Sequence, residues 1–290
     1  MPPAPARWRR RPPVTSRFLD GATPFVMAHR GFSLDGLENS MAAFAAAVDL
    51  GVRHLETDVH STADGVLVAF HDDRLDRVTD REGAVRDLPW ARVREARIDG
   101  REPIPRLEDV LGTWPHVRLN IDVKALGATE PLVDVLVRTA ALDRVCVASF
   151  SDRRRRRVLR RLPAGVASSA GLPTAAAMVA AARLRAPAAA VRLLARDVDC
   201  LQVPVDAYGV TVVEPRFVGA ARRAGLPVHV WTVNDPPTME RLLDLGVAAI
   251  ITDRADLAVD VLRRRAGSGG SGSGGSGSGR SGSGPPGGPS

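Results

Sequence analysis

Aromatic residues, cysteines and long apolar runs are all scarce in this 290-residue sequence. Aromatic side chains make up 4% of the chain, so the 44% that is hydrophobic has to build a core from aliphatic residues and alanine. No apolar run approaches the roughly 20 residues of a membrane span, so we expect no transmembrane segment. The basic, proline-rich start lacks the apolar stretch of a signal peptide, which favours a cytoplasmic protein.

The sequence contains only two cysteines, Cys146 and Cys200, and each lies in an apolar run typical of a buried strand. Neither has the neighbouring residues of a metal-binding or redox motif. We therefore expect two reduced, buried thiols rather than a disulfide or a catalytic cysteine.

Lysine is almost absent, because Lys124 is the only lysine among 40 basic residues in a chain of net charge +7. The arginine run Arg153–Arg157 raises the question of nucleic-acid binding. No aromatic residues are interleaved with this run, although a surface that stacks on bases needs them. We expect no nucleic-acid partner and assign the run to a solvated helix face.

Three segments differ in composition along the chain. Residues 1–23 form an irregular lead-in rich in Pro and Arg, and residues 24–266 have the composition of one folded domain. Residues 267–290 consist of Gly, Ser and Pro apart from Arg280, so they cannot bury apolar surface and are expected to be a disordered tail. The middle segment has a normal length for a single α/β barrel.

Short β-rich runs alternate with helical patterns in the middle segment. Eight runs are expected to be strands: 25–28, 54–59, 117–123, 144–149, 165–170, 200–204, 228–233 and 248–252. This alternation predicts parallel strands joined by helices, and eight repeats predict a (β/α)8 TIM barrel. An open, doubly wound sheet is the alternative, but its GxGxxG signal after the first strand is absent.

Other local patterns refine this expectation. The run 66–70 follows an Asp-Gly turn and is expected to pair with the second strand as a hairpin. The sequence SMAAFAAAVDLG predicts a helix capped by Asn39 or Ser40. Residues 72–106 are polar and interrupt the repeat, so we expect a small insertion after the second strand, with one plausible helix over 89–98.

Acidic residues gather where two neighbouring strands are expected to end, which is where barrel enzymes carry their chemistry. Glu56 and Asp58 are two positions apart in one strand and therefore point to the same face, and Asp122 ends the next strand. Three carboxylates this close repel one another unless a cation lies among them, and all-oxygen ligation suits Ca²⁺ or Mg²⁺. The alternative is that these acids pair with the abundant arginines.

Two histidines, His29 and His71, flank these acids at strand ends, and histidine is suited to proton transfer near neutral pH. Arg30 and Lys124 add positive charge that can bind a phosphate. This set suits cleavage of a phosphodiester, in which one histidine activates the attacking oxygen and the other protonates the leaving alkoxide. His60 shares the inward face of its strand but is expected to reach only the rim.

The ordered motifs of the chain resemble those of the bacterial glycerophosphodiester phosphodiesterase family over nearly all of residues 24–265. AHRGFSLDGLENS resembles the opening HRG…EN block, and LETDVHSTADGVLVAFHDD resembles the ExD…HD block. Later family blocks are matched in order by IPRLEDVL, LNIDVK, VHVWTVND and GVAAIITDRAD. The resemblance implies hydrolysis of small-molecule glycerophosphodiesters to an alcohol and glycerol 3-phosphate, for which a cyclic intermediate has been proposed.

The resemblance also implies roles for individual residues. His29 and His71 match the acid/base pair, Arg30 a phosphate-contacting arginine, Glu56 and Asp58 two metal ligands, Asp122 the third ligand position, Lys124 the lysine beside it, and Trp231 an aromatic residue on the glycerol side of the pocket. The third ligand is often Glu in the family. The shorter Asp122 bears on the choice of metal more than on activity.

Two other functions share parts of this pattern. A sphingomyelinase D-like phospholipase has the same barrel and histidine pair, but those enzymes are typically secreted and carry a disulfide, and the WTVN and ITDRAD blocks favour the first assignment. An inactive barrel that serves as a binding scaffold is disfavoured, because both histidines, the three carboxylates and the lysine are all retained.

Overall fold

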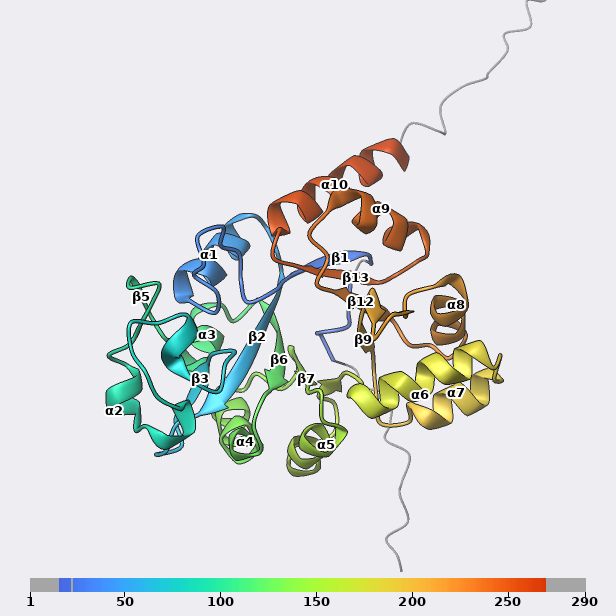
Figure 1. The fold of residues 1–290 in the computed structure, drawn as a ribbon. Helices are drawn as coiled ribbons and strands as arrows, with labels where there is room; N and C mark the ends of the chain where they lie inside the picture. Colours follow the sequence, from blue (N-terminus) through green and yellow to red (C-terminus); the bar gives the residue numbers. More distant parts are fainter. Residues whose placement is uncertain (1–15, 22, 270–290) are drawn as a thin grey trace, which may run out of the picture.

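The computed structural model describes residues 16–21 and 23–269, and its centre is a ring of eight parallel strands (Figure 1). The strands are β1 (Phe25–Ala28), β2 (His54–Ser61), β6 (Arg118–Val123), β7 (Val145–Ala148), β8 (Ala167–Ser168), β9 (Leu201–Pro204), β12 (Val228–Trp231) and β13 (Ala249–Thr252). They are hydrogen-bonded in the order β8-β7-β6-β2-β1-β13-β12-β9. A parallel bridge between Ser169 and Cys200 joins the two ends of this order. The predicted TIM barrel is therefore confirmed.

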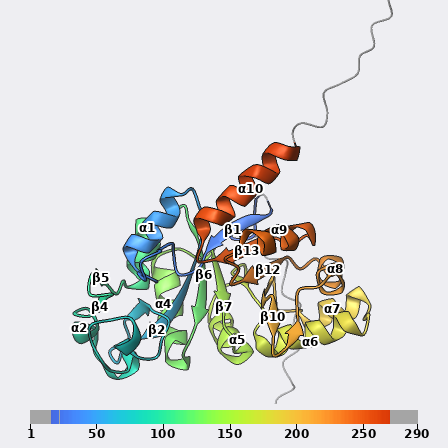
Figure 2. The same cartoon turned by 45° about the horizontal axis from the view of Figure 1, so that its top comes forward.

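Helices surround the ring on its outside (Figures 1 and 2). They are α1 (Met41–Asp49), α3 (Leu107–Thr113), α4 (Thr129–Arg138), α5 (Asp152–Arg161), α6 (Leu172–Arg183), α7 (Ala188–Leu194), α8 (Pro215–Arg223), α9 (Pro236–Asp244) and α10 (Ala255–Gly269). A short 3₁₀ turn η3 (Leu126–Ala128) precedes α4, and a small hairpin of β10 (Asp206–Ala207) and β11 (Val210–Thr211) precedes α8. None of the helices in the described chain combines the length and the apolar character of a membrane span.

Alternation of side chains along each strand separates the helix-facing core from the barrel interior. In β6, the apolar Leu119, Ile121 and Val123 belong to the main apolar core, whereas Asn120 and Asp122 line the pocket inside the barrel. The paired strand β2 follows the same alternation, since β2 and β6 are in register from His54–Arg118 to Val59–Val123. The polar residues that the sequence singled out therefore point inward.

The first helix begins and ends close to the expected residues. The Ser40 hydroxyl accepts a hydrogen bond from the Ala43 N–H, and Gly51 follows the helix with φ +88°. Ser40 is therefore the cap, and Asn39, the other expected candidate, has a different role described below. The buried face comprises Ala43, Phe44 and Ala47.

The insertion after the second strand is confirmed, and it contains its own small apolar core. After β3 (Leu67–Ala69), which pairs antiparallel with β2 as expected, come η1 (Leu75–Arg77), η2 (Val85–Asp87), α2 (Trp90–Val93), β4 (Arg97–Ile98) and β5 (Glu102–Pro103). Buried residues of this unit include Phe70, Leu75, Val85 and Ile98. The helix predicted over 89–98 was wrong beyond its first turn, because Arg97 and Ile98 pair with β5 instead.

The ends of the folded unit differ from the expected boundaries. Phe18, in the predicted lead-in, is fully buried against Met27 and Cys200 inside the barrel, and Figure 1 shows its segment within the ring of strands. At the other end, α10 continues to Gly269, past the expected boundary at 266. Residues 270–290, most of the predicted tail, lie outside the described residues.

The arginine run is part of α5, where most of its charge is paired. Arg155 was expected at a solvated face but is fully buried, 3.0 Å from both Asp152 and Asp197. Arg156 also pairs with Asp197, at 2.6 Å. These contacts explain the run as a structural feature of the helix.

The two cysteines are free and buried, as predicted. Their sulfur atoms lie 4.0 Å apart inside the barrel, where Cys146 and Cys200 pack among apolar side chains. Burial raises the pKa of Cys146 well above its ordinary value. The thiols are therefore core residues.

Candidate active site

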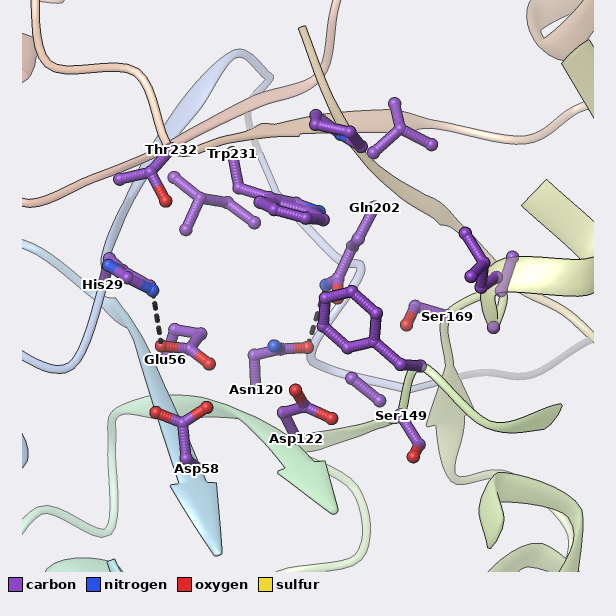
Figure 3. Close-up of a pocket in the computed structure, with 18 of the residues that line it drawn as sticks. His29, Glu56, Asp58, Asn120, Asp122, Ser149, Ser169, Gln202, Trp231 and Thr232 are labelled. Atoms are coloured by element: carbon purple, nitrogen blue, oxygen red, sulfur yellow. Dashed lines mark hydrogen bonds and ion pairs between the residues drawn. The ribbon is translucent and has the colours of Figure 1, made fainter. Parts of the chain in front are cut away.

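A pocket of about 240 Å³ opens at the carboxyl ends of the strands. Figure 3 shows its side chains converging from several strands. All eight residues that the sequence assigned to the site line this pocket: His29, Arg30, Glu56, Asp58, His71, Asp122, Lys124 and Trp231. The barrel thus brings together residues more than 200 positions apart in sequence, from His29 to Trp231.

The HRG motif forms a tight turn at the end of β1. Arg30 has φ +55°, and Gly31 has φ +86°. A Cβ atom at Gly31 would lie 2.7 Å from the backbone carbon of Ala43, so only glycine fits there. The turn directs the Arg30 N–H into the pocket, where it donates a hydrogen bond of 3.1 Å to Glu56 Oε2.

Asp58 and Asp122 face each other across neighbouring strands, and the lone lysine lies between them. The register pairs Asp58 with Asp122. The Lys124 ammonium lies 2.7 Å from Asp58 Oδ1 and 2.8 Å from Asp122 Oδ2, and Arg30 Nε lies 3.1 Å from Asp58 Oδ2. Burial opposes ionisation of Asp58, but the charges of Lys124 and Arg30 hold its pKa below the ordinary value.

Glu56 is buried beside Asp58, but the neighbouring positive charges offset its burial less than they do for Asp58. Its Oε2 atom lies 3.9 Å from His29 Nε2, the contact drawn in Figure 3. Burial and the neighbouring charge of Asp58 raise the pKa of Glu56 to about 7. On Asp122, the buried Oδ1 atom has no hydrogen-bond partner. Together, Glu56, Asp58 and Asp122 form an acidic group that can accept a further positive charge.

Asn39 orients Asp58. Its amide nitrogen donates a hydrogen bond of 3.1 Å to Asp58 Oδ2, and its carbonyl oxygen accepts one of 2.7 Å from the Thr57 hydroxyl. Asn39 is almost fully buried. The sequence suggested only a helix cap at this position, because the contact depends on how the loop returns to β2.

Each candidate catalytic histidine is hydrogen-bonded to an aspartate through Nδ1. His29 Nδ1 lies 2.6 Å from Asp253 Oδ1, and His71 Nδ1 lies 2.6 Å from Asp72 Oδ1. Burial opposes protonation of His29, but the hydrogen bond with Asp253 and the charge of Glu56 raise its pKa overall. Sequence reasoning did not assign Asp253, although its place directly after the eighth strand was a usable signal.

His60 contacts the backbone at His71 rather than the pocket. Its Nε2 atom donates a hydrogen bond of 3.0 Å to the backbone carbonyl of His71. His60 is buried and is not among the residues that line the pocket. Its hydrogen bond supports the position of His71.

Part of the pocket wall is apolar. Trp231 and Phe150 are packed edge to face with ring centroids 5.6 Å apart, and Lys124 Nζ lies 5.6 Å from the centre of the Phe150 ring. Ala148 and Leu172 continue this wall. Sequence reasoning found Trp231 but missed Phe150. A pocket with both charged and apolar walls suits a phosphate ester that carries a carbon group.

Comparison with known proteins finds similar sequences over most of the chain. The model of the glycerophosphoryl diester phosphodiesterase family matches residues 29–257. Probable glycerophosphodiester phosphodiesterase 2 of Mycobacterium tuberculosis is 48% identical over 252 residues, which cover 87% of this chain and 95% of the relative. A glycerophosphodiester phosphodiesterase of Caldanaerobacter subterraneus is 28% identical over 257 residues, covering 82% and 98%.

Solved structures share the fold at lower identity. A glycerophosphodiester phosphodiesterase from Thermotoga maritima has a TM-score of 0.66 and 22% identity, covering 83% of this chain and all of its own. A phosphodiesterase from Oleispira antarctica, solved with the product sn-glycerol-3-phosphate, has a TM-score of 0.67 and 23% identity, covering 83% and 97%. These likenesses support the barrel architecture.

Proposed function

The chain belongs to the glycerophosphoryl diester phosphodiesterase family and is a phosphodiester hydrolase; on that premise we propose that it cleaves glycerophosphodiesters by metal-dependent, two-histidine catalysis. The products are an alcohol and glycerol 3-phosphate, the product bound in the Oleispira antarctica structure. The observation that carries the proposal is the convergence of His29, His71 and the charged residues on one pocket.

The acidic group fits a divalent cation in its chemistry. Glu56, Asp58 and Asp122 offer only oxygen donors, which suit Ca²⁺ or Mg²⁺. Asp122 Oδ1 has no partner, and burial and the charge of Asp58 disfavour the ionised form of Glu56, which a bound cation would stabilise.

As the side chains stand, no three His, Cys, Asp or Glu residues of the described chain converge closely enough to hold a metal ion. Lys124 bridges Asp58 and Asp122 instead. A cation would compete with the Lys124 ammonium for Asp58 Oδ1 and Asp122 Oδ2, whereas Asp122 Oδ1 has no partner.

The other residues of the pocket have distinct roles in the proposed reaction. Arg30 and Lys124 supply positive charge for the non-bridging phosphate oxygens. One histidine accepts the proton of the attacking glycerol hydroxyl, and the other delivers a proton to the leaving alkoxide, which departs as the alcohol. Water then opens the resulting cyclic phosphate to glycerol 3-phosphate, with the two proton transfers reversed. The apolar wall of Phe150 and Trp231 receives the carbon part of the substrate. A cation bound by the carboxylates would supply additional charge stabilisation for the phosphate.

Metal dependence is tested by chelation. We expect purified protein to release glycerol 3-phosphate from glycerophosphocholine, to lose this activity in EDTA, and to regain it with Ca²⁺ or Mg²⁺. The activity is followed by enzymatic detection of glycerol 3-phosphate. Full activity in thoroughly chelated protein would refute the metal proposal, whereas absence of hydrolysis for a panel of head groups would refute the substrate assignment.

The two histidines are tested by truncation. His29→Ala and His71→Ala should each lower kcat by about 10²- to 10⁴-fold, the usual effect of losing a positioned acid or base. His116→Ala is the matched control, because His116 is exposed and does not line the pocket. Steady-state kinetics at pH 7 measures all three. A catalytic effect of His116→Ala as large as that of His29→Ala would contradict the assignment.

A further inference from the structure

The two catalytic histidines are held in the same way by residues from unrelated parts of the chain. In each pair the carboxylate oxygen lies 2.6 Å from Nδ1 of the ring. Asp253 follows β13, whereas Asp72 opens the insertion after β3. The same contact therefore arises twice, once for His29 and once for His71.

This contact determines which ring nitrogen carries the proton. An ionised carboxylate only accepts hydrogen bonds, so the Nδ1 atom bonded to it carries hydrogen. In its neutral form each ring then presents a bare Nε2 atom, and in its protonated form it presents Nε2–H. His29 Nε2 lies 3.9 Å from Glu56 inside the pocket, so this is the atom that faces the substrate.

Asp253 is itself fixed by a dense set of hydrogen bonds. Asn234 Nδ2 donates to Asp253 Oδ2 at 2.8 Å, and the Asn234 side-chain oxygen accepts from the Asp253 N–H at 2.9 Å. The Thr252 hydroxyl donates to the same Asn234 oxygen at 3.0 Å. Both carboxylate oxygens of Asp253 are thus engaged, one by Asn234 and one by His29.

Asp72 is fixed by a different partner. Arg77 donates to both of its oxygens, from Nε at 2.5 Å and from Nη2 at 3.1 Å. Arg77 also bonds Glu38 at 2.7 Å, and Glu38 in turn accepts from Arg30 Nη1 at 3.0 Å. The orientation of His71 is therefore linked, through Arg77 and Glu38, to Arg30, the proposed phosphate contact.

We propose that Asp253 and Asp72 are positioning residues that set the tautomer and the ring orientation of His29 and His71, so that Nε2 of each ring transfers the proton. This inference rests on the proposed two-histidine function. Neither aspartate needs to touch the substrate. Their effect is transmitted through the histidine, so it should appear in kcat and should vanish when the histidine is removed.

The kinetic test uses Asp253→Asn and Asp72→Asn in the full chain. An amide can donate to Nδ1 as well as accept from it, so the ring loses its single tautomer. We expect kcat to fall at least about tenfold with KM changed less than about threefold, in line with the loss seen when an aspartate behind a catalytic histidine becomes asparagine. Matched controls are Asp256→Asn, at a residue that pairs with Arg254, and Asp87→Asn, at an exposed residue of the same insertion as Asp72.

A double-mutant cycle separates positioning from a general structural role. Asp253→Asn should have little effect on the residual rate of His29→Ala, and Asp72→Asn should have little effect on that of His71→Ala. An equal loss in both backgrounds would overturn the proposal, as would a rise in KM with kcat unchanged, which would indicate a direct substrate contact. Thermal melting verifies that each variant is folded.

Histidine side-chain ¹⁵N NMR gives a readout independent of activity. In the neutral wild-type rings we expect Nδ1–H for His29 and His71, and a mixture of tautomers in the asparagine variants. If the wild-type protein hydrolyses no glycerophosphodiester, the proposed function fails, and this measurement alone decides the inference. Nδ1–H would then support orientation by the aspartates, and Nε2–H in the wild-type rings would overturn it.

Discussion

The ammonium of Lys124 contacts two carboxylates at once, and its side chain is only 18% exposed. Every other basic residue in the chain except the histidines is arginine, so this position departs from the composition of the whole sequence. A compact ammonium on a flexible stem fits between Asp58 and Asp122, whereas a planar guanidinium is wider. We predict that Lys124→Arg folds normally but loses about 10- to 100-fold in kcat/KM, measured on glycerophosphocholine.

The companion variant Lys124→Met separates shape from charge. It removes the cation and leaves Asp58 and Asp122 facing each other, so we expect a loss at least as large as that of Lys124→Arg. If Lys124→Arg has wild-type kcat/KM, steric selection at this position is wrong. If Lys124→Met is also fully active, the phosphate-binding role is wrong as well.

Single residues of the site differ in how far the sequence could predict them. Residue type and strand parity were sufficient for His29, Glu56 and Asp122, because inward-facing positions at strand ends converge in any barrel. Asp253 and Asn39 were not assigned, because their roles depend on side-chain contacts across loops that no local pattern specifies.

At the scale of elements, the eight strands were predictable because each is a short β-rich run that alternates with a helical pattern, and each is found close to its expected range. The insertion was harder to predict. Residues 89–98 contain good helix formers, yet Arg97 and Ile98 form β4 because tertiary packing buries Ile98 in the core of the insertion. Local propensity was outweighed by that contact.

The connection between α5 and α6 depends on one buried carboxylate. Asp152, the first residue of α5, accepts hydrogen bonds from the Thr174 hydroxyl at 2.8 Å, from the Gly171 N–H at 3.1 Å and from Arg155 Nη2 at 3.0 Å. Burial opposes its ionisation, but the bonds from Thr174 and Arg155 lower its pKa below the ordinary 3.8. Asp152 thus caps the start of α6 and pairs the buried Arg155.

This arrangement predicts a pH-dependent loss of stability in Asp152→Asn. Removing one partner of a buried pair costs about 3 kcal/mol in the free energy of unfolding at pH 7. Because the folded-state pKa is lowered, the wild-type carboxylate contributes fully above pH 3.8 and loses this contribution as the pH falls through its folded pKa. Urea unfolding from pH 7 downward should show a constant difference that shrinks below about pH 4.

Asp134→Asn is the matched control for Asp152→Asn, because Asp134 is exposed on α4. It should change the free energy of unfolding by less than about 0.5 kcal/mol at every pH. A difference between wild type and Asp152→Asn that is absent at pH 7, or that grows as the pH falls below 4, would contradict the role given to Asp152.

At the scale of the whole molecule, the barrel closes only when residues far apart in sequence meet, as where Phe25 of β1 pairs with Ala249 of β13. The number and alternation of strands predicted this closure, since eight βα repeats have few other compact arrangements. The composition of the lead-in did not reveal that Phe18 packs inside the ring. An isolated aromatic residue beside a proline-rich stretch has no periodicity that distinguishes burial from exposure.

Phe18 closes the end of the barrel opposite the active site. Its ring is fully buried, lies edge to face with His54 at 5.4 Å, and packs with Met27 and Cys200. We predict that Phe18→Ala lowers the free energy of unfolding by about 3–5 kcal/mol, because the deleted ring leaves a cavity that the rigid strands cannot fill. Since His54 begins β2 and the pocket lies at the other end of the strands, kcat measured well below the melting temperature should be unchanged.

Leu184→Ala, at an 82% exposed position, should leave both the free energy of unfolding and kcat near wild type. Chemical denaturation and steady-state kinetics on the same preparations measure the two effects, and an unaltered stability in Phe18→Ala would show that this residue does not close the barrel.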